Sequence, residues 1–189
     1  MIVNDKSLVR GMKDAYRRAG YTIMVRPNDT WVIHSGYWAV VIDGQSNVPN
    51  EVLSLIVLHV GFLPEMETAY RVFKTDTGTA IQEELYAVAD ETISKLEAAR
   101  MQPDNVADIQ QTKLTLGNYR VWQQEKDLKI LLIDPRYESI MDSKRGVRCA
   151  GDTIFQAGGV STVYVMRVET EADNAQIEHL SQMQWVTTK

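Results

Sequence analysis

Three short runs of β-branched and aromatic residues near the N-terminus restrict the fold of this chain most strongly. They cover residues 21–26, 30–34 and 38–43, and the turn formers Pro27-Asn28-Asp29 and Ser35-Gly36 separate them. Because a parallel connection needs about a dozen residues or more, strands joined by such short turns can pair only as antiparallel neighbours. The pattern therefore predicts an antiparallel meander.

Helical patterns lie on both sides of this meander. Ser7 is the expected N-cap of a first helix that ends near Ala19, and a second, largely apolar helix is expected over residues 49–60. A long amphipathic helix is expected over residues 82–100, and its apolar side is formed by Leu85, Val88, Ile93 and Leu96. Helices that alternate with antiparallel strands predict the α+β class, with antiparallel sheets and packed helices.

The second half of the chain repeats this mixture of strands and helices. Asp134 and Pro135 are suited to cap and open a short helix, Gly158-Gly159 indicates a tight hairpin, and residues 171–183 form a final helical pattern. Pro103-Asp104-Asn105 is the best boundary between two units. We therefore expect a first α+β half over residues 1–102 and a second over residues 103–189.

A weak internal repeat connects the two halves. The segment Tyr70–Phe73 reads Y-R-V-F and the segment Tyr119–Trp122 reads Y-R-V-W, and each is followed by a polar turn, a second strand and a helical pattern. Two interpretations stay open, because four matched residues arise easily by chance: a duplicated hairpin-helix unit, or coincidence.

Charge and cysteine content limit the environment and the partners. The formal charge of -5 excludes a uniformly basic nucleic-acid coat, although a local positive face remains compatible with it. Cys149 is the single cysteine, so no internal disulfide can form and a cytoplasmic location is expected. The longest apolar run, residues 52–63, is short and interrupted, so no membrane segment is expected.

The most specific surface feature is a row of four cations in the first helix. Lys6, Arg10, Lys13 and Arg17 follow the spacing i, i+4, i+7, i+11, which places them within a narrow arc of the helix surface. Such a row can follow a phosphate backbone. It can also be an ordinary solvated helix face, and the sequence leaves both interpretations open.

No local motif indicates catalysis, a metal or a cofactor. The three histidines lack zinc-site spacing, no phosphate-binding glycine motif is present, and Asp76-Thr77-Gly78 is an ordinary hairpin turn. Cys149 lacks an identifiable base, and a half-buried strand position is the simpler reading. We therefore expect a non-enzymatic protein without metal or cofactor.

Two segments of the second half resemble a DNA sliding-clamp subdomain. They are K-I-L-L-I-D-P-R-Y-E-S-I-M at Lys129–Met141 and T-V-Y-V-M-R-V at Thr162–Val168. The resemblance implies helices that present Lys and Arg to DNA while the sheets face outward. It implies that the first-helix row faces DNA, joined by Lys144, Arg145 and Arg148. The chain departs from the family in being short for a ring protomer and in its acidic segment Glu83–Glu97.

The leading hypothesis is a non-enzymatic, clamp-like replication or prophage accessory factor that contacts duplex DNA through Lys6, Arg10, Lys13 and Arg17. A first alternative is a homo-oligomeric protein-interaction module with tryptophans at its contact surface, from the set Trp31, Trp38, Trp122 and Trp185. A second alternative is an enzyme whose dispersed site local spacing cannot reveal.

Overall fold

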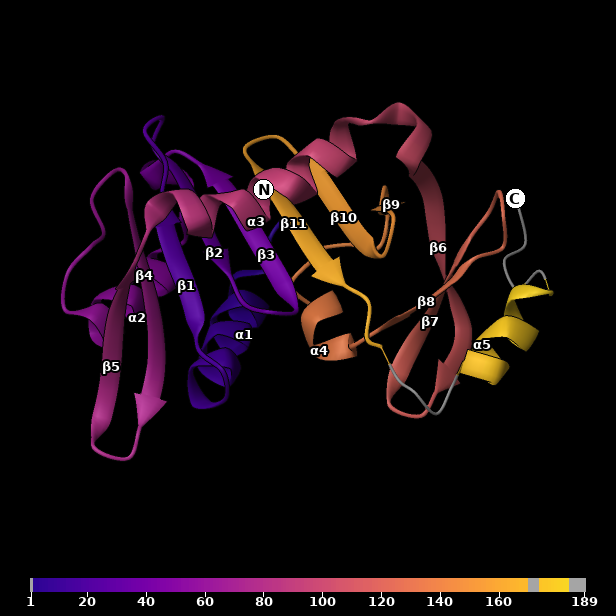
Figure 1. Cartoon of the computed structure of the whole chain (residues 1–189), viewed down its shortest axis with the longest axis horizontal. Helices are drawn as coiled ribbons and strands as arrows, with labels where there is room; N and C mark the ends of the chain where they lie inside the picture. Colours follow the sequence, from indigo (N-terminus) through magenta and orange to yellow (C-terminus); the bar gives the residue numbers. More distant parts are fainter. Residues whose placement is uncertain (1, 170–173, 184–189) are drawn as a thin grey trace.

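Eleven strands form one sheet in which every hydrogen-bonded pair is antiparallel, and helices pack on both of its faces (Figure 1). The structure is a computed structural model that describes residues 2–169 and 174–183. This architecture confirms the predicted α+β class.

The first half contains the predicted meander. Its three strands are β1 (Tyr21–Val25), β2 (Thr30–His34) and β3 (Trp38–Asp43). A hairpin formed by β4 (Thr68–Thr75) and β5 (Gly78–Glu84) extends the sheet beyond β1, so that β5 is an outermost strand. The helical elements of this half are α1 (Asp5–Arg17), η1 (Gln45–Asn47), α2 (Asn50–Val60) and α3 (Tyr86–Met101).

The second half continues the same sheet, because β11 pairs with β3. The expected boundary between residues 102 and 103 falls between α3 and the short helix η2 (Pro103–Asn105). The strands that follow are β6 (Val106–Leu116), β7 (Tyr119–Gln124), β8 (Ile130–Ile133), β9 (Arg148–Ala150), β10 (Thr153–Gly158) and β11 (Ser161–Met166). The helices are α4 (Pro135–Glu138) and α5 (Asn174–Ser181), and residues 171–173 of the predicted last helix lie outside the described residues.

The strand order is mirrored about the β3–β11 pair. Outward from this pair the strands run β3, β2, β1, β4, β5 on one side and β11, β10, β9, β6, β7, β8 on the other. The inner three strands on each side form a meander that a helix precedes, α1 or α4. The matched segments Tyr70–Phe73 and Tyr119–Trp122 lie on β4 and β7, which are not at equivalent distances from the centre.

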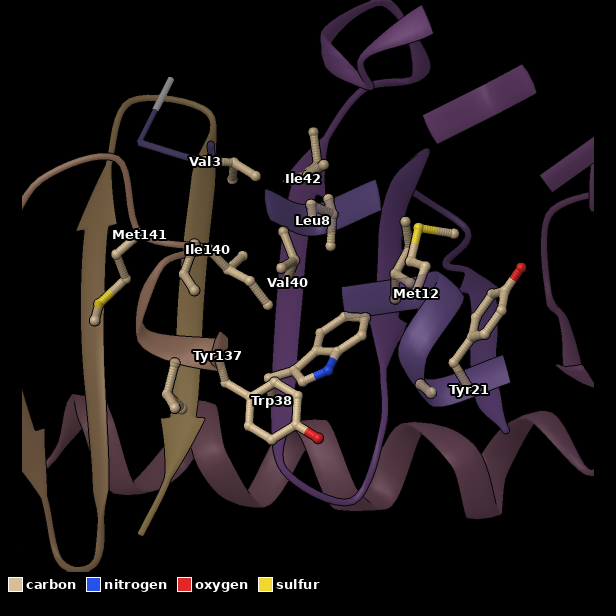
Figure 2. Close-up of a cluster of buried hydrophobic side chains, with 14 of the residues drawn as sticks. Val3, Leu8, Met12, Tyr21, Trp38, Val40, Ile42, Tyr137, Ile140 and Met141 are labelled. Atoms are coloured by element: carbon tan, nitrogen blue, oxygen red, sulfur yellow. The ribbon is translucent and has the colours of Figure 1, made fainter. Parts of the chain in front are cut away.

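The central strands are apolar at nearly every position because both sheet faces are covered. Ile23, Ile33 and Val40 pack with α1, α2 and α4 on one face. The intervening residues, such as Met24 and Val32, pack with α3 on the other face. Figure 2 shows the first of these clusters, in which side chains from α1, β3 and the α4 region converge. Each fully buried large side chain contributes roughly 1.5–3 kcal/mol, so the burial of Leu8 and Met12 in the first cluster anchors α1 firmly.

The N-terminus of α1 differs from the prediction. Asn4 is the N-cap, and its Oδ1 atom accepts a hydrogen bond of 3.1 Å from the backbone N–H of Ser7. The predicted cap, Ser7, lies inside the first turn, and the helix ends at Arg17 rather than near Ala19. Both Asn4 and Ser7 are good capping residues three positions apart, so local preference alone could not separate them.

The start of α3 was also predicted wrongly. Residues 82–84 belong to β5, and the helix begins at Tyr86. Leu85 and Val88, expected on its buried side, are 78% and 61% exposed, whereas Ala89 and Ile93 are buried. The guanidinium of Arg26, on the loop after β1, forms ion pairs with two carboxylates of α3, at 2.7 Å from Asp90 and 2.9 Å from Glu97. The ion pairs of Arg26 and the burial of Ala89 and Ile93 hold α3 against the sheet.

Candidate functional site

The four cations of the predicted row all lie on the exposed side of α1. The buried residues of this helix are Leu8, Gly11, Met12 and Ala15, which point into the core. Lys6, Arg10, Lys13 and Arg17 are exposed, and the segment that carries them is helical, as expected. At 1.5 Å per residue the row is about 16 Å long.

A groove runs beside this row where α1 meets α4. Gly11 allows the close approach, because a Cβ atom at this position would lie 3.2 Å from Cδ1 of Ile140. The groove has a volume of about 390 Å³. We call it the α1 groove, and its lining residues are Lys6, Val9, Arg10, Gly11, Lys13, Asp14, Arg17, Arg136 and Tyr137. All four residues of the predicted row therefore share one concave surface.

The predicted cations have no ionic or hydrogen-bonding partner in the described part of the chain. Within residues 2–169 and 174–183, the side chains of Lys6, Arg10, Lys13 and Arg17 form no ion pair or hydrogen bond. Four positive charges without ion-pair partners along one helix edge repel one another and attract an anionic ligand. The row thus concentrates positive charge on a chain whose formal net charge is -5.

Arg136 adds a fifth cation that the sequence did not indicate. Asp134, the N-cap of α4, receives hydrogen bonds from the Arg136 side chain, of 3.0 Å from Nε to Oδ1 and 2.6 Å from Nη2 to Oδ2. Burial of the Asp134 carboxylate opposes its ionisation, but the bonds from the Arg136 side chain and backbone outweigh burial and lower its pKa. Asp134 therefore holds Arg136 in position beside α1. Arg136 is far from α1 in the sequence, and only the fold brings the two together. No local sequence pattern could therefore have predicted that Arg136 joins the groove.

A buried aromatic ring closes the α4 side of the groove. Tyr137 is 5% exposed and stacks on Tyr37, with ring centroids 5.5 Å apart and planes inclined by 6°. Burial raises the pKa of the Tyr137 hydroxyl. One wall of the α1 groove thus carries the cations of α1, and the other is formed by Arg136 and Tyr137 of α4.

The sequence matches no protein family model, and it has no significant match among curated proteins. In the part of the chain that the structure describes, no helix is long and apolar enough to cross a membrane.

The additional cations that the clamp resemblance implied do not line the α1 groove. Lys144 lies 2.9 Å from Glu138, and Arg148 lies 3.2 Å from Asp108, so both are engaged in ion pairs. Arg145 is exposed, on the loop before β9. The structure separates these three residues from the row on α1.

Three of the four tryptophans proposed for a contact surface belong to the core. Trp31, Trp38 and Trp122 are at most 1% exposed. Trp185 lies outside the described residues. The three described tryptophans therefore stabilise the fold and offer no surface to a partner.

A second groove, of about 620 Å³, lies on the α3 face of the sheet. The Oγ1 atom of Thr22 donates a 3.0 Å hydrogen bond to Glu84, and Arg71 donates one of 2.9 Å to the carbonyl of Ala19. His34 also lines this groove, and burial lowers its pKa, against the opposing influence of Glu84. The Nε2 atom of His34 is buried without a hydrogen-bond partner among the described residues. Ser35 also lines this groove, and its Oγ atom accepts a 3.3 Å hydrogen bond from the backbone N–H of Tyr37.

The remaining candidates for catalytic chemistry, Cys149, Asp76 and His59, lie in separate parts of the fold. Cys149 is fully buried, and burial raises the pKa of its thiol to about 11, so the thiolate is scarce at neutral pH. Asp76 lies in the exposed turn between β4 and β5. His59 accepts or donates a 2.8 Å hydrogen bond with the Tyr21 hydroxyl. Among the described residues, no three His, Cys, Asp or Glu side chains form a metal-binding cluster.

Proposed function

We propose that this protein is a non-enzymatic, clamp-like accessory factor that binds the phosphate backbone of duplex DNA along the α1 groove. The observation that carries the proposal is the row formed by Lys6, Arg10, Lys13 and Arg17, which is exposed and free of ion pairs among the described residues. Surface cations without a structural partner retain their full charge for an external anion.

The dimensions of the row fit a phosphate backbone. A row about 16 Å long spans the axial rise of about five phosphates on one strand of duplex DNA. Four phosphate contacts predict that the logarithm of the association constant falls with the logarithm of salt concentration with a slope of about -3.6. Because phosphate contacts carry no sequence information, two duplexes of equal length and different sequence should bind equally well.

The mirrored strand order supports the clamp-like part of the proposal. In a clamp, helices face DNA and the sheets stand behind them. Here α1 and α4 lie on the same face of the sheet (Figure 1). Residues of both helices line the α1 groove. We propose that residues 1–102 and 103–189 are related halves, which accounts for the matching meanders on either side of the β3–β11 pair.

A fluorescence-polarisation titration with a labelled duplex tests the binding proposal. The wild-type protein should bind at low salt and lose affinity steeply as salt increases. The Lys13→Ala variant should bind more weakly at every salt concentration, with a slope shallower by about 0.9. Replacement of all four row residues by alanine should abolish binding.

Lys95→Ala is the matched control, because it removes the same charge from α3, on the opposite face, where Lys95 is paired with Glu91 at 2.8 Å. It should leave both affinity and slope unchanged. Absence of binding by the wild-type protein, or equal effects of Lys13→Ala and Lys95→Ala, would refute the proposal.

A further inference from the structure

The outer edges of the two outermost strands, β8 and β5, differ in their hydrogen bonding. Along β8, the backbone N–H of Val168 donates a 2.8 Å hydrogen bond to the carbonyl of Leu132, so the chain covers part of this edge itself. Along β5, the only hydrogen-bonded strand neighbour is β4, and no other backbone segment of residues 2–169 and 174–183 bonds to it. The outer edge of β5 therefore carries free N–H and C=O groups.

The β5 edge has few of the features that usually prevent strand addition. Natural edge strands are protected by proline, by charged side chains and lysine above all, by a bulge or by extreme shortness. The sequence of β5, G-T-A-I-Q-E-E, contains neither proline nor lysine, and its two charged residues, Glu83 and Glu84, stand together at one end. Its seven residues pair with β4 in unbroken register, from Ala69 opposite Glu84 to Thr75 opposite Gly78. Ile81, at the centre, is 42% exposed.

We propose that β5 pairs with β5 of a second copy of this chain, antiparallel and centred on Ile81. In an antiparallel pair, residues directly opposite one another point to the same face of the sheet. A two-fold axis perpendicular to the sheet must then pass between two copies of the same residue. Ala80, Ile81 and Gln82 are the possible centres.

The side chains favour Ile81 as the centre. In this register Ile81 packs on its own copy, and Thr79 lies opposite Glu83 of the second copy. Centring on Gln82 would place Ile81 opposite Glu83, an apolar group against a carboxylate. Centring on Ala80 would pair only residues 78–82 and leave both glutamates without a neighbour. Of the three registers, only the one centred on Ile81 pairs all seven residues of β5 and places Ile81 against its own copy.

Charge complementarity supports the same register. Lys74 on β4 is the neighbour of Thr79, on the face that also carries Glu83. In the proposed dimer, Glu83 of the second copy lies on the far side of Thr79 from Lys74. Two strand spacings of about 4.8 Å separate their backbones, which extended Lys and Glu side chains can bridge. Within one copy Glu83 is opposite Tyr70, well along the strand from Lys74, so this attraction acts only between copies.

The dimer would carry both α1 grooves on one face. A two-fold axis perpendicular to the sheet keeps each face of the sheet on its own side, so the α1 face of one copy continues into that of the other. An interface made mainly by one pair of strands is smaller than the roughly 1,600 Å² typical of stable complexes, and association in the micromolar range is expected.

Sedimentation equilibrium over a concentration series tests the association. The wild-type protein should shift from monomer to dimer as its concentration rises. Ile81→Lys places two ammonium groups opposite each other on the axis and should give a monomer. Val160→Lys, the same change at an exposed residue in the β10–β11 turn, should dimerise like the wild type. A wild-type protein that stays monomeric up to about 200 μM, far above a micromolar dissociation constant, would overturn the proposal.

Two further experiments test the register. Among Ala80→Cys, Ile81→Cys and Gln82→Cys, the second should form an intermolecular disulfide most rapidly, while the buried Cys149 stays silent. Glu83→Lys and Lys74→Glu should each weaken the dimer, and the double variant should restore it. A fastest crosslink at another position, or no restoration by the double exchange, contradicts the register.

Circular dichroism of each variant separates loss of association from loss of fold. None of these substitutions changes a residue that lines the α1 groove. DNA binding by a monomeric Ile81→Lys variant would therefore leave the proposed function intact.

Discussion

The Asp14 carboxylate lies 3.6 Å from the Arg136 guanidinium across the α1 groove. Its other ionic partner is Arg18, one turn further along α1, at 3.3 Å. Asp14 is the only acidic residue that lines the groove in the described part of the chain. It therefore offsets part of the positive charge that the row presents to a ligand, while it links α1 to α4.

Asp14→Asn should tighten the binding of duplex DNA. The change removes one negative charge from the groove and frees Arg18 and Arg136 from an exposed ion pair, which costs the fold at most about 1 kcal/mol. Affinity at low salt should rise about two- to fivefold, and the gain should shrink as salt increases. Fluorescence polarisation measures it, with Asp76→Asn in the β4–β5 turn as control. Equal or weaker binding by Asp14→Asn would argue against a ligand in this groove.

The contact between Gly11 and Ile140 should control how closely α1 and α4 pack. Gly11→Leu forces a side chain against Ile140 and Trp38 and should lower the free energy of unfolding by about 1–3 kcal/mol. Gly11→Ala adds only a Cβ atom, whose tight contact is offset by a gain in helix propensity of roughly 1 kcal/mol, so stability should change little. Urea denaturation measures both variants.

A second change checks that overpacking is the cause. Ile140→Ala makes room beside position 11, so Gly11→Leu should be less harmful in that background than in the wild type. Equal losses in the two backgrounds would show that the residues do not interact.

The row on α1 could be predicted because helical geometry fixes the angles between residues of one helix. Lys6 and Arg17 are eleven positions apart, and no tertiary contact is needed to place them on the same face. Arg136, the fifth cation of the groove, and Asp134, which holds it in position, come from a distant segment. Their position depends on the packing of Ile140 against Gly11, which no local pattern encodes.

The errors in α3 have a different physical origin. Leu85 and Val88 are larger and more apolar than Ala89, so periodicity alone assigned them to the core. The small Ala89 instead lets the helix backbone approach the sheet, and the ion pairs of Arg26 fix its rotation. Similarly, the sequence allowed Trp38 to lie either at an interface or in the core. Because helices cover both faces of the sheet, Trp38 is buried in the core.

The half-buried His34 predicts how stability depends on pH. Burial lowers its pKa below the ordinary value of 6.5, with Glu84 acting in the opposite direction. Below pH 6.5 the unfolded chain therefore binds a proton that the folded chain resists. Stability is complete above pH 6.5 and is lost as the pH falls toward the lowered pKa, by at most about 1.4 kcal/mol per pH unit for one histidine.

Urea denaturation at several pH values between 8 and 5 measures this loss, with the range set by the ordinary histidine pKa. His34→Gln should flatten the dependence, although His59, whose pKa burial also lowers, should keep part of it. His179→Gln, at an exposed position on α5, should leave the profile unchanged. A profile that is flat in the wild-type protein would contradict the assigned shift.

The thiol of Cys149 should react only when the protein unfolds. The side chain is fully buried between β6 and β10, and burial raises the pKa of the thiol to about 11. At pH 8 only about one thiol in a thousand is then ionised, and the buried sulfur cannot reach a reagent. Ellman's reagent should label the native protein slowly and the protein in concentrated urea at once. The exposed thiol of the Ile81→Cys variant is the positive control, and rapid labelling of the native wild type would show that Cys149 is accessible and reopen a nucleophilic role for it.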